Sequence, residues 1–87
     1  MLKYLHEFMT AYENLDRSAR KPILKKLDEL RRAEFSSYPH QALKGEQFRG
    51  LYKLRVGDWR LIYKLHDKEC LFVTLGHRSE VYRSTRL

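Results

Sequence analysis

Cationic side chains lie between regularly spaced apolar residues in the segment 51–66, and this spacing gathers them on one surface. Apolar residues occupy the positions between them, which is the two-residue period of a strand with one buried face. Lys53 and Arg55 therefore share one face of a predicted strand, and Arg60 and Lys64 share one face of the next strand. Because amino and guanidinium groups bind phosphate oxygens, this face favours a site for a phosphate-bearing polymer.

The charge of the whole chain favours the same kind of ligand. The 87 residues include 18 Lys and Arg against 11 Asp and Glu, and the net charge is +7. Residues 1–34 hold 8 of the cations and 6 of the acids, whereas residues 35–87 hold 10 and 5, so the segment with the alternating pattern carries most of the excess. This balance favours nucleic acid before membrane, because no stretch combines a basic face with a long apolar one.

The composition argues against several other classes of protein. The single cysteine, Cys70, allows no internal disulfide and no cysteine-based zinc site, and the four histidines lack the spacing of metal ligands. We therefore expect neither a metal nor a cofactor. The sequence has no run of about 18 apolar residues and no signal-peptide pattern, so we expect a cytoplasmic protein without a membrane partner.

Two helices are predicted before the strands. Apolar residues at spacings of three, four and three predict a helix over about residues 5–15, and a second stripe predicts another that ends near Glu34. Asp16 or Ser18 is typical of the residue that caps the start of a helix. Pro22 complicates that start, because proline lacks the backbone N–H and is comfortable only in the first turn. We expect the second helix to begin late, near Lys21, or to be distorted at the proline.

Three antiparallel strands are predicted over about residues 51–56, 61–65 and 71–75. Gly57 and Asp58 form the turn of a tight hairpin, since glycine adopts the positive φ that such a turn needs. Residues 1–4 predict a short edge strand, and residues 35–50 predict a loop. We expect Gly76 to end the last strand and Ser79 to cap a short C-terminal helix that holds Tyr82.

Together these elements predict one α+β domain over residues 1–87. Two N-terminal helices pack on an antiparallel sheet of three to four strands, and a short helix ends the chain. The helices cover the apolar face of the sheet in this arrangement, so we expect the cationic face to be left open.

Three segments of the chain carry a resemblance to a known family. Residues 43–45 (LKG), 52–63 (YKLRVGDWRLIY) and 76–82 (GHRSEVY), following two helices, resemble the RelE/ParE superfamily of bacterial toxins. Its RelE-like members are endoribonucleases (mRNA interferases) that cleave mRNA in the ribosomal A site and so inhibit translation. The resemblance implies the RelE-like fold, and it implies three partners: the ribosome, mRNA and a RelB-like antitoxin with an acidic or amphipathic segment.

Five positions match the catalytic residues of the RelE-like branch. They are four cations and a tyrosine: Lys53, Arg55, Arg60, Arg78 and Tyr82. The chain departs from the family pattern at two points. Leu51 stands where the pattern has a further lysine, and the segment between Gly76 and Tyr82 is shorter.

The chemistry of RNA cleavage accounts for these residue types. When the 2′-OH attacks the phosphate, a proton must leave that hydroxyl, charge develops on a phosphorane, and a proton must reach the departing 5′-oxygen. Arg60 and Arg78 suit the phosphorane, because a guanidinium holds two phosphate oxygens in a fixed fork. Lys53, Tyr82 and His77 are candidates for the proton transfers. Further polar residues near the set are expected to bind the RNA: Lys44, Lys64, His77 and Arg83.

Other interpretations stay open at this point. A ParE-like toxin that inhibits DNA gyrase, or a non-toxic basic domain that binds nucleic acid, also fits a basic α+β chain. Arg55 and Arg60 serve equally well as exposed cations that protect a sheet edge from aggregation. Tyr82 in that case is an anchor for the C-terminal segment.

Overall fold

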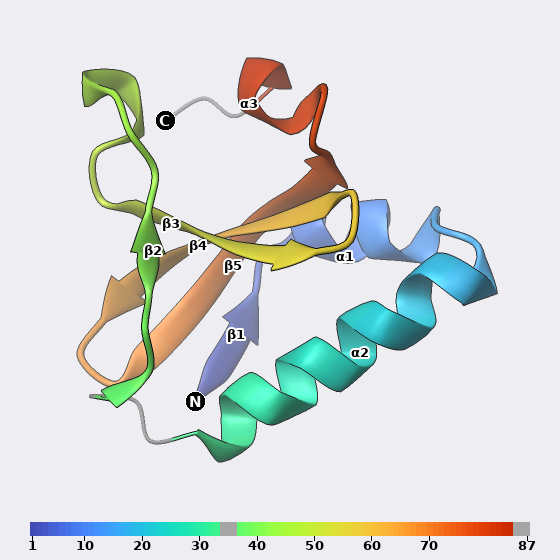
Figure 1. Cartoon of the computed structure of the whole chain (residues 1–87), viewed down its shortest axis with the longest axis horizontal. Coiled ribbons are helices and arrows are strands. Elements are labelled where there is room, and N and C mark those ends of the chain that lie inside the picture. The colour runs from blue at the N-terminus through green and yellow to red at the C-terminus, as the bar shows by residue number, and fades with distance from the viewer. Residues whose placement is uncertain (34–36, 85–87) are drawn as a thin grey trace.

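The computed structural model describes residues 1–33 and 37–84, which form a five-stranded sheet with helices on both faces (Figure 1). The elements in chain order are β1 (Leu2–Tyr4), α1 (His6–Glu13), α2 (Arg17–Arg32), β2 (Gln41–Ala42), the short 3-10 helix η2 (Glu46–Phe48), β3 (Leu51–Val56), β4 (Trp59–His66), β5 (Glu69–His77) and α3 (Val81–Ser84). The α+β class, the two N-terminal helices and the short C-terminal helix are confirmed. No helix within the described segments is both long and apolar enough to cross a membrane.

The sheet has the strand order β1-β5-β4-β3-β2. The predicted hairpin is confirmed, since β3 and β4 pair antiparallel around Gly57, whose φ is 60°. The predicted edge strand at the N-terminus is also present, but it pairs parallel to β5. The sheet is therefore mixed and has one strand more than the three to four predicted. The extra strand is β2, which lies in the segment expected to be a loop.

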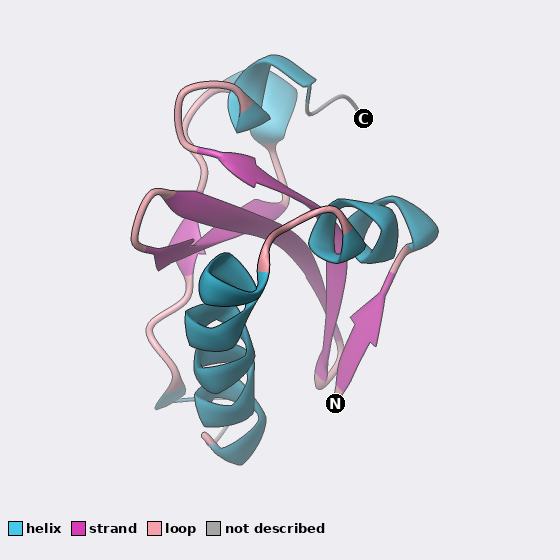
Figure 2. Ribbon diagram, turned by 90° about the vertical axis from the view of Figure 1, so that its right-hand side faces the viewer, coloured by secondary structure: helices cyan, strands magenta, loops and turns pink. Residues whose placement is uncertain are grey.

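The two N-terminal helices cover one face of the sheet, as Figure 2 shows with α1 and α2 in front of the strands. Their apolar stripes meet the inward side chains of β3, β4 and β5 in the main core. Phe8 of α1 packs against Phe72 of β5, with ring centroids 5.4 Å apart, and Tyr63 packs against Phe72 at 5.1 Å. Burial of such aromatic side chains supplies much of the stabilisation in a domain of this size.

The second helix begins earlier than Pro22 led us to expect. The Asp16 carboxylate accepts a hydrogen bond from the Ala19 N–H at 2.9 Å, and this bond holds the pKa of the carboxyl below its ordinary value. The helix therefore starts at Arg17 and not near Lys21. Pro22 lies exposed inside it and removes only one N–H from a helix of 16 residues. Glu34, where the helix was expected to end, lies outside the described residues.

A second, smaller core covers the other face of the sheet, so the prediction that this face is open is wrong. Leu51 of β3 and Ile62 of β4 are buried there beneath Val81 of α3. Three partly buried side chains complete this cover: Leu43, Phe48 and Tyr82. The prediction considered the cations on this face and overlooked Leu51 and Ile62. These two residues lie between the cations and give α3 an apolar surface to pack on.

The end of β5 also differs from the prediction. Gly76 continues the strand and pairs with Arg60, and the strand ends at His77. A Cβ atom on Gly76 would lie 3.1 Å from the Cβ of Val81, so glycine permits the close approach of α3 to the sheet. Ser79 does not cap α3, which begins at Val81, because its hydroxyl bonds the His77 ring instead.

Candidate functional site

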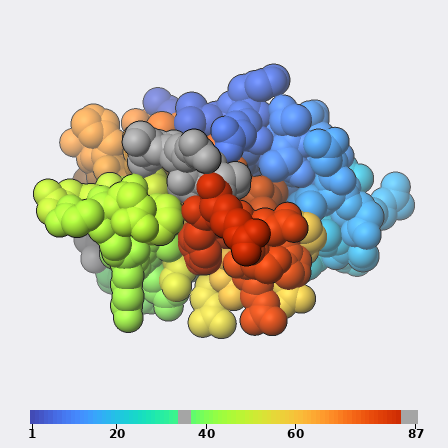
Figure 3. Space-filling view, turned by 90° about the horizontal axis from the view of Figure 1, so that it is seen from above, coloured from blue at the N-terminus to red at the C-terminus, as the bar shows by residue number. Residues whose placement is uncertain are grey.

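Three of the predicted site residues line one hollow on the face that carries α3. Lys44 precedes η2, Lys53 belongs to β3 and Tyr82 to α3, and with Leu43 and Phe48 they enclose about 270 Å³. Figure 3 shows α3 beside the segment of β2 and η2 on this side of the molecule. The tertiary structure thus brings together two lysines and a tyrosine from three separate parts of the chain.

Packing against Phe48 fixes the position of Tyr82. The two ring centroids lie 6.1 Å apart, and Val81, the preceding residue, is buried against Leu51 and Ile62. Because α3 is anchored by these apolar contacts, the half-buried Tyr82 is held at the wall of the hollow. Sequence analysis did not assign Phe48 a role, since it lies in a segment with no regular period.

Further cations extend the site along β3. Arg55 lies two residues from Lys53 on the same face of the strand and is exposed. Lys64 of β4 pairs with Leu51 and is also exposed on this face. Arg83 is exposed on α3, one residue after Tyr82. These side chains give the surface around the hollow a positive charge, as the alternation predicted.

Arg60 stands apart from the other predicted catalytic residues because it is buried. Only 7% of its surface is exposed, although its Cα lies opposite that of the exposed Arg55. Its Nη1 donates hydrogen bonds to the carbonyl oxygens of Gly57 (2.8 Å) and Trp59 (3.0 Å). The guanidinium therefore stabilises the β3–β4 turn through these two hydrogen bonds, and it does not form part of the exposed cationic surface.

Arg78, another predicted site residue, contacts the same turn at the protein surface. The backbone N–H of Arg78 donates to the carbonyl of Asp58 at 2.8 Å, and its Nε lies 3.5 Å from the Asp58 carboxylate. The Arg78 side chain is 63% exposed, so this ion pair is solvated and weak. Sequence analysis did not predict that Asp58 contacts Arg78. Only the pairing of β4 with β5 brings the hairpin turn next to the end of β5.

His77 lies at the end of β5 beside the same turn. Its Nδ1 accepts a hydrogen bond from the Ser79 N–H at 3.2 Å and lies 2.8 Å from the Ser79 hydroxyl. A ring nitrogen that accepts from an N–H carries no proton, so this geometry fits the neutral imidazole with its proton on Nε2. The ring also packs edge-on against Trp59, with centroids 5.7 Å apart.

Within residues 1–33 and 37–84, no three His, Cys, Asp or Glu side chains gather as metal ligands. Cys70 is buried, and burial raises the pKa of its thiol. The reactive groups that this surface offers are therefore amino, guanidinium, imidazole and phenol groups. Groups of these kinds are suited to contact phosphate oxygens and to exchange protons.

Solved structures of bacterial and archaeal toxins share this fold. The RelB-RelE antitoxin-toxin complex from Methanococcus jannaschii matches with a TM-score of 0.71 and 17% identity over 93% of this chain and 95% of that one. The isolated E. coli RelE toxin matches with a TM-score of 0.69 and 24% identity, over 95% and 90%. YafQ from E. coli matches with a TM-score of 0.61 and 23% identity, over 94% and 97%. No curated protein sequence gives a significant match.

The likeness to these structures shows the fold that the chain shares with them. The sequence shows the family: residues 2–82 match the sequence pattern of the family described as the ParE toxin of type II toxin-antitoxin systems, parDE. The chain belongs to this family. This confirms the prediction, made from the hairpin motif and the GHRSEVY segment, that the chain is a member of the RelE/ParE superfamily.

Proposed function

We propose that the protein is a ribosome-dependent endoribonuclease, an mRNA interferase that cleaves mRNA in the A site and inhibits translation. The observation that carries the proposal is the hollow lined by Lys44, Lys53 and Tyr82, with the exposed Arg55 beside it. It combines groups that bind phosphate with a hydroxyl that exchanges a proton, which are the requirements of RNA cleavage by the 2′-OH.

In this mechanism the 2′-oxygen bonds to phosphorus, the bond from phosphorus to the 5′-oxygen breaks, and the products are a 2′,3′-cyclic phosphate and a 5′-hydroxyl. Lys53 and Arg55 offset the charge of the phosphorane, and Tyr82 and Lys53 are the groups placed to exchange the two protons. Arg78 binds the RNA backbone next to the turn. Arg60 supports the site by holding the turn and does not contact the substrate.

The hollow is small for an RNA strand, and this supports the proposed dependence on the ribosome. A volume of about 270 Å³ encloses less than a drug-sized ligand needs, and the remaining cations are exposed. Positioning of the scissile phosphate must therefore come largely from the ribosome, which holds the mRNA in a fixed geometry. We expect cleavage of mRNA on translating ribosomes and none of the same RNA in solution.

An antitoxin is the partner we propose for the free toxin. Four of the similar solved structures are complexes of RelE with RelB, and their toxin chains share this fold. The net charge of +7 favours an acidic ligand, and a segment that orders on binding covers a large surface of a small domain. Expression of the chain alone is expected to arrest growth, and co-expression of its antitoxin to relieve the arrest.

A second candidate is a non-nuclease toxin that inhibits DNA gyrase. The burial of Arg60 favours it, because one of the five residues that match the nuclease branch is then lost from the surface. Both candidates predict growth arrest, so growth alone does not separate them. A non-toxic nucleic-acid-binding domain predicts no arrest.

The test is primer extension on mRNA from arrested cells, run beside a supercoiling assay on purified gyrase. Cleavage at defined codon positions with active gyrase is the expected result. Lys53→Ala and Tyr82→Phe should reduce cleavage, whereas Lys25→Ala on the exposed side of α2 should leave it unchanged. Intact transcripts together with inhibited gyrase would assign the chain to the second candidate.

A further inference from the structure

A hollow of about 420 Å³ lies between the end of α1 and the start of α2. Its walls are an aromatic ring, an apolar side chain and three cations: Tyr12, Leu24, Arg17, Arg20 and Lys21. Figure 1 shows the turn between the two helices on the opposite side of the molecule from β2. The hollow shares no lining residue with the one that Tyr82 lines, so it is a separate feature of the surface.

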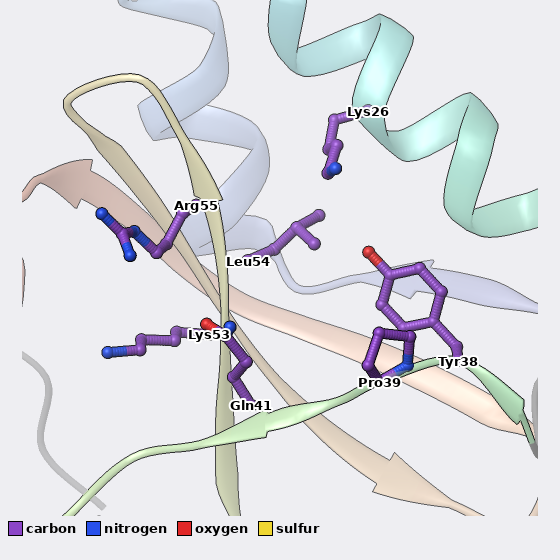
Figure 4. Close-up of a pocket in the computed structure, with 7 residues that line it drawn as sticks. All are labelled: Lys26, Tyr38, Pro39, Gln41, Lys53, Leu54 and Arg55. Atoms are coloured by element: carbon purple, nitrogen blue, oxygen red, sulfur yellow. The ribbon is translucent and has the colours of Figure 1, made fainter.

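The three cations line one space because they share one stripe of α2. Positions 17, 20, 21 and 24 follow the helical period, which places their side chains on the same face of the helix. The cations beside β3 are arranged differently. Figure 4 shows Lys53 and Arg55 projecting to one side of that strand, whereas Lys26 lies on the other side. The start of α2 therefore concentrates positive charge in a way that β3 does not.

Ion pairs distinguish the two halves of α2. The second half pairs its cations with acids of the same helix, as in the 2.7 Å pair of Arg32 and Asp28. Within residues 1–33 and 37–84, no ion pair includes a cation of the hollow. The Asp16 carboxylate precedes these cations but accepts hydrogen bonds from the first turn of the helix, which lower its pKa more than the charge of Arg20 does. The charge of the hollow is therefore available to an anion from outside the chain.

This arrangement of cations is unfavourable in the free chain. The N-terminus of a helix carries a partial positive charge, and no acid lies in the first turn of α2. Like charges three and four residues apart also repel one another. Arg20 adds a further cost, because its Nε is buried and has no hydrogen-bond partner in the described part of the chain. An anion in the hollow reduces the repulsion and gives the cations a partner.

The Arg20 guanidinium is positioned before any ligand binds. It lies over the ring of Tyr12, 5.9 Å from the centroid, where the electrons of the ring attract a cation. Arg20 is half-buried, whereas Arg17 and Lys21 are exposed. A side chain that is already fixed loses little conformational entropy when it binds a phosphate group. The hollow thus holds one positioned guanidinium between two exposed cations.

We propose that this hollow binds a small phosphorylated ligand of the nucleoside diphosphate class. Its adjacent phosphates meet Arg17, Arg20 and Lys21, and its base packs against Leu24 and Tyr12. The volume of about 420 Å³ lies within the range of small-molecule sites, roughly 300–1,000 Å³. The inference does not depend on the nuclease proposal, in which none of these residues takes part.

The surroundings of the hollow favour a compact ligand over a strand of RNA. A single strand of nucleic acid needs a basic groove that continues over several nucleotides. The neighbouring helix α1 contains two acids, Glu7 and Glu13, and neither lysine nor arginine. On the other side, the paired half of α2 alternates acids with cations. The positive charge is therefore confined to the hollow.

The probe for the test is ADP, titrated without added metal into the full chain and followed by calorimetry. We expect a saturable site and a rise in Tm with ADP concentration. Inorganic pyrophosphate, which lacks the base, should bind about fivefold more weakly or less, and adenosine, which lacks the phosphates, should not bind. A uridine decamer should change the affinity for ADP by less than about twofold, because the hollow is not part of a longer basic groove.

Two matched lysine variants test the position of the ligand. Lys21→Gln removes a charge from the hollow and should weaken ADP binding by about fivefold or more. Lys68→Gln removes the same charge from the exposed β4–β5 turn and should change the binding by less than about twofold. Arg20→Lys keeps the charge but removes the planar fork, so it should also weaken binding.

A further variant separates binding from structural support. Arg17→Gln relieves the repulsion at the start of α2, so the Tm of the free chain should rise while its affinity for ADP falls. A residue with only a structural role should lower Tm instead. The inference is overturned if ADP does not bind, if pyrophosphate binds as tightly, if the decamer displaces ADP, or if Lys21→Gln and Lys68→Gln act alike. ADP binding by a chain that cleaves no mRNA would support this site and remove the nuclease proposal.

Discussion

Replacing Arg60 with methionine tests whether this residue is a buried support of the β3–β4 turn or an exposed catalytic cation. Methionine keeps most of the apolar volume of the arginine stem and removes both hydrogen bonds from Nη1 to the carbonyls of Gly57 and Trp59. The matched control is Arg55→Met, which removes the same charge from the position directly opposite in the strand pair, where the side chain is exposed.

The expected magnitude follows from the two bonds. A hydrogen bond from a charged donor contributes about 1.5–3 kcal/mol, but the Gly57 carbonyl lies in an exposed turn and regains water when the arginine is lost. The two bonds sum to about 3–6 kcal/mol, and because the Gly57 carbonyl regains water we expect Arg60→Met to lower the free energy of unfolding by only about 2–3 kcal/mol. For a domain of this size that lowers Tm by about 10–20 °C.

Arg55→Met should behave in the opposite way. An exposed substitution changes the free energy of unfolding by less than about 0.5 kcal/mol, and the loss of one of two facing like charges opposes any destabilisation. Its effect is expected in cleavage, with a rate loss of about 10²-fold if Arg55 stabilises the phosphorane.

The assay is thermal and urea unfolding of both variants, followed by ribosomal cleavage at a temperature where each is folded. Arg60→Met should then recover most of its activity, whereas Arg55→Met should not. Equal Tm values for the two variants would refute the assignment of Arg60 as a support. A folded Arg60→Met with no cleavage would show instead that the guanidinium acts on the substrate.

Three further predictions follow from the packing and the titrating groups. Burial raises the pKa of Tyr63 above its ordinary value of 10.0, so the unfolded chain loses this proton first, and stability should fall as pH rises above about 10. Tyr63→Phe should remove that alkaline fall and, because the hydroxyl lies 2.7 Å from His40 Nδ1, cost about 1 kcal/mol at pH 7, both measured by urea unfolding. Gly76→Ala should displace Val81, so the fall in cleavage should exceed what the change in Tm accounts for. The NMR shifts of the Val81 methyl groups are the check, and unchanged shifts would contradict the close packing. The carboxylate of Glu69 accepts a hydrogen bond from Lys3 of β1, and this lowers the pKa of Glu69 below 4.5. The ion pair therefore contributes to stability above that pH, and the contribution is lost as pH falls. Glu69→Gln should therefore lower Tm at pH 6 and match the native chain near pH 2, and a difference independent of pH would contradict the ion pair.

Local patterns in the sequence determined most of the elements and their order. The periods of 3.6 and 2 residues identified the two helices and the three main strands, and Gly57 identified the hairpin turn, because these features depend on residues close together in the chain. The predicted start of α2 was wrong: Asp16 was one of two candidate caps, and Pro22 led us to expect a start near Lys21, whereas the helix begins at Arg17. The charge pattern likewise placed Lys53 and Arg55 on one face of a strand.

Contacts between distant parts of the chain decided what covers each face of the sheet. Alternation states which residues share a face, but it does not state whether that face meets solvent. Arg60 is buried with its guanidinium bonded to carbonyls of the β3–β4 turn, although Arg55 opposite it is exposed, and Ile62 lies under Val81 from the end of the chain. The hollow with Tyr82 also comes from such long-range contacts, which no local period encodes.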